Sequence, residues 1–224
     1  DLMDAAKIYD KMAGSYQNLS TGRSAYLRAV TDIIPKHSLD PLQYLDVGCG
    51  DGDRTVEIAA IVGALWVEAI DISSEMAKIA ESKMDKFECT SMKNYFSLDS
   101  YDLITALWNV LGHIKEADRL ESLKNMEMHL TTDGLFIFDV NNRYNLGYGF
   151  WNVVKNIIFR RSGWHTFKFK GEEFPTYLYS PREIKGLLKK AGLEIVKKYG
   201  VDYETGKVSK SLFRGQMVFV VRRK

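Results

Sequence analysis

The sequence predicts a single α/β domain built on a mostly parallel sheet with helices on both faces. Short apolar runs typical of buried strands alternate with helical segments over residues 43–140. The chain has 224 residues, 46% of them hydrophobic and 27% charged, which suits one compact core. Two β-rich runs then end the chain with no helix between them, so one edge of the sheet should be mixed.

The amino-terminal segment should be helical. Residues 2–13 carry apolar side chains at an imperfect helical spacing, and a second helix is expected over residues 23–34, where Pro35 stops it. Residues 1–34 would then form a helical cap on the domain.

The middle of the chain predicts the parallel part of the sheet. Strands are expected over residues 43–47, 65–70, 86–90, 101–106 and 135–140, and helices over 53–62, 73–84 and 116–130. Ser73 or Ser74 would cap the second of these helices, and residues 132–134 would form the turn before the last strand.

The carboxyl-terminal segment predicts a helix followed by a pair of strands. Ser180 and Glu183 have the spacing of a capping box, with Pro181 in the first turn, and the helix should stop at Gly192. Strands are expected over residues 193–199 and 216–222, joined by a polar loop.

The segment 141–179 is too long for an ordinary connection, which predicts a lid or an acceptor-binding insertion. It is rich in aromatic residues, and residues 150–159 predict a short helix with an apolar face, followed by Arg160 and Arg161. Such a face suits a hydrophobic or lipid-linked acceptor, or peripheral contact with a membrane. The alternative is a helix and hairpin that simply cover the sheet.

Composition limits the remaining possibilities. A net charge of +2 gives no footprint for nucleic acid, so no nucleic-acid partner is expected. Cys49 and Cys89 are too few for a disulfide framework or a zinc site, and both should be buried in strand-like surroundings. No apolar run approaches 18 residues and no signal pattern begins the chain, so a cytoplasmic protein is the default expectation.

The most informative motif is a glycine-rich turn between a strand and a helix. Gly48, Gly50 and Gly52 alternate after a buried strand, so the backbone can turn sharply and approach a ligand closely. Asp71 ends the next strand, where a carboxylate can accept hydrogen bonds from ribose hydroxyls. Asp46 and Asp51 place negative charge at the turn, which disfavours a pyrophosphate and favours an ammonium or sulfonium group.

These motifs, with later landmarks in the same order, resemble class I S-adenosylmethionine-dependent methyltransferases. The landmarks are Asp46–Gly52, Asp71–Ser73 with Met76, Tyr101–Ile104, Gly134–Phe136 and Ala191–Leu193. The resemblance implies a Rossmann-like sheet of seven strands, the last one antiparallel, and S-adenosyl-L-methionine as the cofactor.

The resemblance also implies individual cofactor contacts. Asp46 and the backbone of Gly48, Cys49 and Gly50 would hold the methionine part together with Leu107, while Asp71 would bind the ribose, Ile72 would pack on the adenine, and Tyr16 would lie in a segment folded over the cofactor. After the third strand many relatives have an acidic residue for the adenine amino group, whereas this chain has Ser91 and Met92. Ser91 can still form a hydrogen bond.

The acceptor is expected beside the loop 108–113, because ligands bind at the carboxyl ends of parallel strands. Asn109 and His113 are the candidates to orient or deprotonate it, although a structural role for His113 fits the sequence equally well. Tyr9 and Tyr26 in the helical cap could contribute to the same pocket, or they could be half-buried aromatics that only pack the helices. No carboxylate cluster follows the fourth strand, so a metal-dependent mechanism is not expected.

The sequence thus predicts a methyltransferase that acts on a small-molecule acceptor, with the acceptor atom (N, O or C) left open. Two alternatives remain. One is an RNA or protein methyltransferase, against which the near-neutral charge and the lack of an appended binding domain argue. The other is a non-catalytic regulatory scaffold that binds S-adenosylmethionine without turnover.

Overall fold

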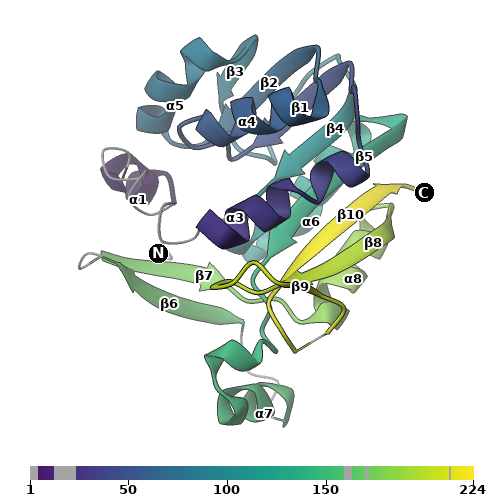
Figure 1. Cartoon of the computed structure of the whole chain (residues 1–224). Coiled ribbons are helices and arrows are strands. Elements are labelled where there is room, and N and C mark those ends of the chain that lie inside the picture. Colours follow the sequence, from purple (N-terminus) through teal and green to yellow (C-terminus); the bar gives the residue numbers. More distant parts are fainter. Residues whose placement is uncertain (1–4, 13–23, 159–162, 170–171, 212) are drawn as a thin grey trace.

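The computed structural model describes residues 5–12, 24–158, 163–169, 172–211 and 213–224 (Figure 1). Its centre is an eight-stranded sheet with the strand order β3-β2-β1-β4-β5-β10-β8-β9. These strands are β1 (Gln43–Val47), β2 (Trp66–Asp71), β3 (Lys86–Cys89), β4 (Tyr101–Ala106), β5 (Leu130–Val140), β8 (Leu193–Val201), β9 (Val208–Ser209) and β10 (Gln216–Arg223). The first five run parallel, and β10 runs antiparallel to both β5 and β8.

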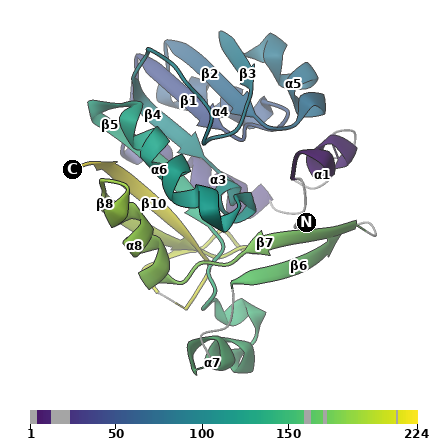
Figure 2. The same ribbon diagram turned by 180° about the vertical axis from the view of Figure 1, so that it is seen from behind.

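Helices cover both faces of this sheet, as Figures 1 and 2 show from opposite sides. One face carries α3 (Ser24–Thr31) and α4 (Asp53–Val62), whose buried side chains include Tyr26, Val30 and Ile58. The other face carries α6 (Arg119–Met128) and α8 (Pro181–Lys190), which bury Leu123 and Leu188 against Phe136, Phe138 and Phe219 of the sheet. The predicted α/β architecture with an antiparallel strand near the carboxyl terminus is confirmed, and β9 adds a two-residue edge strand.

The remaining helices are short and lie at the edges of the sheet or in the connections. They are α1 (Ala5–Met12), η2 (Ile34–Lys36), α5 (Ser74–Ala80), η3 (Glu81–Lys83), η4 (Val110–His113), η5 (Glu116–Asp118), η6 (Leu146–Tyr148) and α7 (Phe150–Ile158). Ser73 caps α5 by accepting a hydrogen bond from the Met76 N–H, and Ser180 and Glu183 form the predicted capping box of α8.

The segment after β5 folds into a helix and a separate hairpin. After η6 and α7 the chain forms β6 (Trp164–Phe169) and β7 (Glu172–Tyr177), an antiparallel two-stranded sheet. The hairpin reaches toward α1, whereas α7 projects from the body of the molecule (Figure 1). A lid role for residues 141–179 and a cap role for residues 1–34 stay predictions.

The helix expected over residues 23–34 ends at Thr31, and Pro35 lies inside η2. Two further boundaries are wrong because of strand pairing. Residues 132–134 do not form a turn but lie inside β5, because the pairing with β4 shifts from Tyr101↔Leu130 to Leu103↔Leu135. The extra residues bulge there, and Gly134 is required since a Cβ atom would lie 2.6 Å from the Tyr101 carbonyl oxygen. The predicted helix over residues 116–130 begins as η5 and ends at Met128, since Leu130 already pairs in the sheet.

The prediction for the cysteines is half right. Cys49 is buried, in the turn after β1 rather than in a strand, while Cys89 is exposed. Cys89 ends β3, the outermost strand on its side of the sheet, and has no further strand to cover it.

Candidate active site

The glycine-rich turn follows β1 with the left-handed backbone that the sequence predicts. Gly48, Gly50 and Gly52 have φ angles of 73°, 60° and 80°. A Cβ atom on Gly48 would lie 2.7 Å from the Cγ2 atom of Val110, so this glycine also allows the loop after β4 to approach the turn. The turn and that loop therefore form one wall.

Asp71 closes the turn from the neighbouring strand. Its two carboxylate oxygens accept hydrogen bonds from the N–H groups of Gly50, at 2.9 Å, and Ser73, at 2.9 Å. Burial raises the pKa of Asp71, and the hydrogen bonds from Ser73 and Gly50 oppose that rise. Each oxygen keeps acceptor capacity for a further donor, such as the hydroxyl of a ribose.

Asp46 lies beneath the turn in a hydrogen-bonded site. Thr55 donates to one carboxylate oxygen at 2.5 Å and Thr105 donates to the other at 2.5 Å. Burial raises the pKa of Asp46, while these two hydrogen bonds and the charge of Arg54 lower it. The carboxylate is thus held in one orientation by α4 and β4.

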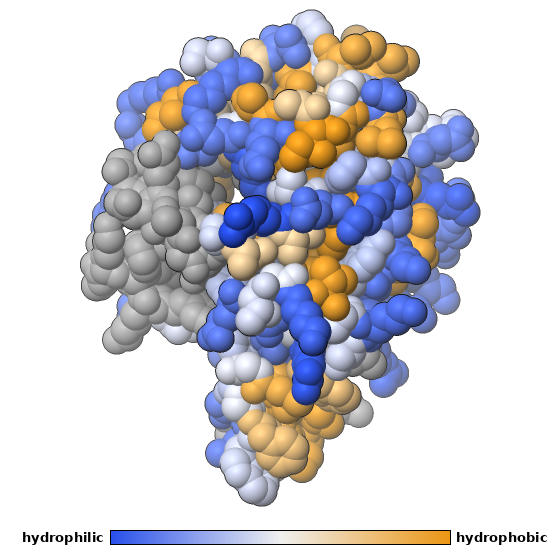
Figure 3. Space-filling model, in the orientation of Figure 1, coloured by the Kyte–Doolittle hydropathy of each residue, from blue (hydrophilic) through white to orange (hydrophobic). Residues whose placement is uncertain are grey.

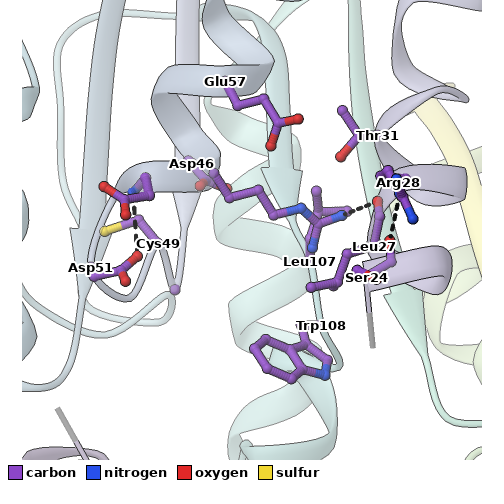
Figure 4. A pocket seen from close by; sticks show the side chains of 13 residues that line it. Ser24, Leu27, Arg28, Thr31, Asp46, Cys49, Asp51, Glu57, Leu107 and Trp108 are labelled. Atoms are coloured by element: carbon purple, nitrogen blue, oxygen red, sulfur yellow. Dashed lines mark hydrogen bonds between the residues drawn. The ribbon is translucent and has the colours of Figure 1, made fainter. Parts of the chain in front are cut away.

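A cavity of about 310 Å³ opens between the glycine turn and α3 (Figure 4). Figure 4 shows Asp46, Cys49 and Asp51 on one side of it, and Ser24, Arg28 and Thr31 across from them. The lining also contains Gly48, Asp53, Arg54, Glu57, Leu27, Leu107 and Trp108. Both signs of charge therefore face the cavity.

Arg54 lines this cavity and has one donor without a partner. Its Nη2 atom donates to the Leu27 carbonyl at 3.2 Å, but its buried Nε atom has no hydrogen-bond partner. An N–H group buried in this way is costly to leave unpaired. The Arg54 guanidinium thus supplies positive charge at the wall of the cavity.

The loop after β4 is held in a strained conformation by Asp139. Trp108 and Asn109 have φ angles of 66° and 64°, which are uncommon for residues other than glycine. Asp139, at the end of β5, accepts hydrogen bonds from the Trp108 N–H and from the Tyr26 hydroxyl, the latter at 2.6 Å. One buried carboxylate therefore ties the loop to α3.

Asn109 joins this loop to the segment that follows β5. Its Oδ1 atom accepts from the Asn141 N–H at 2.9 Å, and its Nδ2 atom donates to the Thr176 hydroxyl at 2.6 Å. The side chain is 3% exposed. Both ends of the amide are engaged, so Asn109 fixes the loop against β7.

His113 lies at the end of η4, between β7 and α1. Its half-buried ring hydrogen-bonds to the backbone of Pro175, whose only available group is the carbonyl, and makes an edge contact with Tyr9 at 5.7 Å between ring centroids. Burial lowers the pKa of His113 to about 4, so the ring is neutral at pH 7. In the tautomer that donates to Pro175, the other ring nitrogen is an acceptor.

Lowering the pH should therefore destabilise the protein through His113. The folded pKa is about 4 and the ordinary value is 6.5, so between these values the unfolded chain binds a proton that the folded chain excludes. Stability from this source is complete above about pH 7 and is lost as pH falls toward 4. We expect the melting temperature to fall more between pH 7 and pH 5 in the wild type than in His113→Gln. Equal falls would contradict a His113 ring that stays neutral in the folded chain.

Helix α1 reaches the same region from the amino terminus. The Asp10 carboxylate accepts from the Ser73 hydroxyl at 2.6 Å and from the Glu75 N–H at 3.2 Å. These hydrogen bonds hold the pKa of Asp10 below its usual value. Tyr9 and Asp10 thus connect the loop beyond β4 to the start of α5.

The structure also places the predicted adenine contacts. Ile72 is half-exposed just after Asp71, as expected of an apolar side chain that a ligand can cover. The Ser91 hydroxyl accepts from the Asn94 N–H at 3.2 Å and keeps its own proton to donate. Met92 is buried in the core, and its carbonyl accepts from Asn125. Tyr16 lies outside the described residues.

Sequence reasoning missed Arg54, Asp139 and Asp10. A signal existed for Asp139, because a carboxylate at the end of an apolar strand needs buried donors. Arg54 could have been suspected as a cation in the first turn after the glycines. The partners of Asp10 are 63 and 65 residues away, so nothing local in the sequence indicates them.

The described part of the chain contains neither a candidate membrane span nor a candidate metal site. Within it, no helix has the length and apolar character needed to cross a bilayer. The same residues contain no group of three or more His, Cys, Asp or Glu side chains arranged to hold a metal ion.

Known proteins resemble this chain in sequence and in fold. A family model described as a methyltransferase domain matches residues 19–198. An uncharacterized protein of Methanocaldococcus jannaschii is 31% identical over 224 residues, covering 95% of this chain and 85% of that protein.

Two solved structures illustrate the similarity of fold. An S-adenosylmethionine-dependent methyltransferase from Clostridium acetobutylicum superposes with a TM-score of 0.65 at 22% identity, covering 97% of each chain. CalS10 of Micromonospora echinaspora, an amino pentose methyltransferase solved with S-adenosylmethionine bound, gives a TM-score of 0.63 at 18% identity, covering 93% of this chain and 96% of CalS10. The chain therefore belongs to the methyltransferase domain family and has the Rossmann-like fold of class I S-adenosylmethionine-dependent methyltransferases.

Proposed function

We propose that this protein binds S-adenosylmethionine between the glycine turn and α3 and transfers a methyl group to a small-molecule acceptor. The observation that carries the proposal is the cavity beside the turn, with Asp46 and Arg54 at its wall. An amino-acid moiety presents an ammonium and a carboxylate, which need opposite charges on the protein. This cavity offers both.

The residues present fit the cofactor part by part. Arg54 would pair with the methionine carboxylate, Asp46 would attract the ammonium group, and Leu107 would pack on the side chain. Gly48 lets Val110 pack against the turn, which brings the loop after β4 to the same side of the cofactor site. CalS10, with a similar fold, was solved with S-adenosylmethionine bound, which supports the same cofactor here.

The nucleoside part would extend over the end of β2. The Asp71 oxygens that hold Gly50 and Ser73 would accept from the ribose hydroxyls, and Ile72 would pack on the adenine ring. Ser91 would donate a hydrogen bond to the adenine in place of the acidic residue of many relatives. The buried side chain of Met92 leaves only its backbone for such a contact.

The acceptor would bind where the loop 108–113, α1 and β7 meet. The bound cofactor supplies an electrophilic methyl group, so the protein mainly has to orient the acceptor and exclude water. His113 would accept a proton from an acceptor that arrives protonated, since its ring is neutral at pH 7. Asn109 would keep the loop in place.

Several observations support a small acceptor over RNA or a protein. CalS10, which has a similar fold, is an amino pentose methyltransferase, and an amino pentose is a small molecule. The proposed acceptor position is covered by Tyr9 of α1 and by β7, so a large substrate would have to displace them. The β6–β7 hairpin would then be the acceptor-covering part of residues 141–179, leaving α7 for another role. A hydrophobic or lipid-linked acceptor remains part of this proposal.

Methyl transfer from S-adenosylmethionine labelled in the methyl group tests the function directly. The protein would be incubated with pools of amines, amino sugars, carboxylic acids and lipid extracts, with total RNA and bulk protein as separate pools. We expect label in a small-molecule pool. Label found only in RNA or protein would overturn the proposal of a small-molecule acceptor. Binding of S-adenosylmethionine without transfer to any pool would instead favour the non-catalytic regulatory scaffold.

A further inference from the structure

One end of the molecule presents apolar side chains that the methyltransferase site does not use. Four apolar residues of α7 are exposed, namely Phe150, Trp151, Ile157 and Ile158 at 61%, 71%, 45% and 65%. Figure 3 shows apolar surface on the projecting lower end of the molecule, where α7 lies in Figure 1. Exposed Leu146 and Phe213 belong to the same end, because the Leu146 N–H donates to the Phe213 carbonyl at 2.9 Å.

Helix α7 is anchored with this face outward. Its other side buries Val153 and Asn156, and Asn156 donates to the Arg143 carbonyl at 3.4 Å. Asn152 donates to the Tyr148 carbonyl at 2.8 Å. The apolar face of α7 is therefore exposed while the helix is packed against the rest of the chain. An exposed apolar face of this kind commonly marks a site that binds a partner or a membrane.

The segments that form this end of the molecule are rich in basic residues, of which Lys155, Lys207, Lys210 and Arg214 are exposed. Residues 140–171 contain six Lys and Arg and no Asp or Glu, and residues 205–221 contain three Lys and Arg and no acidic residue. The rest of the chain then holds 22 basic and 29 acidic residues, so the overall charge of +2 conceals a strong asymmetry. The two acid-free segments meet, since the Gly215 N–H donates to Asn145 and Gln216 donates to Tyr148.

From this juxtaposition we propose that the α7 end docks on an anionic lipid bilayer, with the exposed face of α7 inserted at the interface. The Trp, Phe and Ile side chains on the outer face of this short helix suit the acyl boundary of a bilayer. The basic residues of the same end suit the anionic headgroups. A second copy of the chain fits less well, because two identical basic ends would repel each other. The docking does not depend on which acceptor is methylated.

Vesicle sedimentation tests this proposal with lipids of known charge. We expect the protein to bind vesicles of phosphatidylglycerol and phosphatidylcholine at equal parts, and to bind pure phosphatidylcholine at least tenfold more weakly. Binding should weaken at 0.5 M salt, since surface charges are then screened. Equal binding to both vesicle types, or none to either, would overturn the proposal.

Matched variants separate the docking face from general effects. The triple variant Phe150→Ser, Trp151→Ser, Ile158→Ser should lose binding at least tenfold, whereas Phe96→Ser with Leu98→Ser, which changes two exposed apolar residues elsewhere, should keep it. Lys155→Glu with Arg214→Glu should also weaken binding, and Lys36→Glu with Lys124→Glu should not. Equal losses in the test and control variants would overturn the docking face.

Tryptophan fluorescence and sedimentation in solution distinguish a lipid bilayer from other partners that could bind the exposed face of α7. The emission of the wild type should shift to shorter wavelength with anionic vesicles, and Trp151→Phe should remove the shift while the protein still binds. Self-association that the triple variant abolishes, without vesicle binding, would instead assign the face to a second copy. Retention on polyuridylate that exceeds vesicle binding would assign it to single-stranded nucleic acid.

Discussion

Asp139→Ala should lower the free energy of unfolding by about 3–5 kcal/mol, the largest stability effect expected of any single substitution at the site. The change leaves the Tyr26 hydroxyl and the Trp108 N–H without their buried acceptor. It also removes the contact that holds Trp108 and Asn109 in their left-handed conformation. Denaturant unfolding measures this loss of free energy. The dependence of the unfolding free energy on denaturant concentration (the m-value) should not change.

Two further variants make this result specific. Tyr26→Phe removes one of the two partners and should cost only about 1 kcal/mol. Asp99→Ala changes an exposed carboxylate and should leave stability within about 0.5 kcal/mol of the wild type. If Asp139→Ala proved as stable as Asp99→Ala, the carboxylate would not be the tie between the loop and α3.

His113→Gln should lower the maximal rate of methyl transfer about 100-fold while leaving cofactor affinity within about twofold. The reason is position, because His113 contacts Tyr9 and Pro175 in the loop beyond β4, where the acceptor is proposed to bind, and has no proposed contact with the cofactor. Glutamine retains a donor for the Pro175 carbonyl, so the loop should keep its conformation while the base is lost.

The rate would be measured in single turnovers with the acceptor found by the transfer assay. His37→Gln is the matched control, since His37 is a half-buried histidine that hydrogen-bonds to Tyr199 far along the chain from the loop. It should retain the wild-type rate. A wild-type rate for His113→Gln would make His113 a structural residue and leave positioning alone to account for transfer.

Much of the fold could be predicted because its signals are local. The bounds of β1 and α4 follow from an apolar run and a helical stripe on either side of the glycine turn, and the capping box of α8 is a four-residue pattern. The turn predicted at residues 132–134 failed for a physical reason. Its residues have turn chemistry, but pairing with β4 on both sides draws them into a bulged strand.

The site was predictable only where a motif carries it. The glycines and Asp71 stand at a spacing that the sequence displays, whereas the role of Asp139 depends on Tyr26, which is 113 residues away. The same applies to charge. The net value of +2 argues against an anionic partner, yet it averages over acid-free segments that come together only in the folded chain.

Calorimetric titration with S-adenosylhomocysteine, the product form of the cofactor, tests the central claim most directly. We expect one site per chain in the wild type, and Asp71→Ala should weaken binding by about 1–3 kcal/mol, because the ribose hydroxyls lose their acceptor and the Gly50 and Ser73 N–H groups lose their partner. Asp99→Ala should bind as the wild type does. Equal affinity in the wild type and in Asp71→Ala would show that the cofactor does not bind at the end of β2.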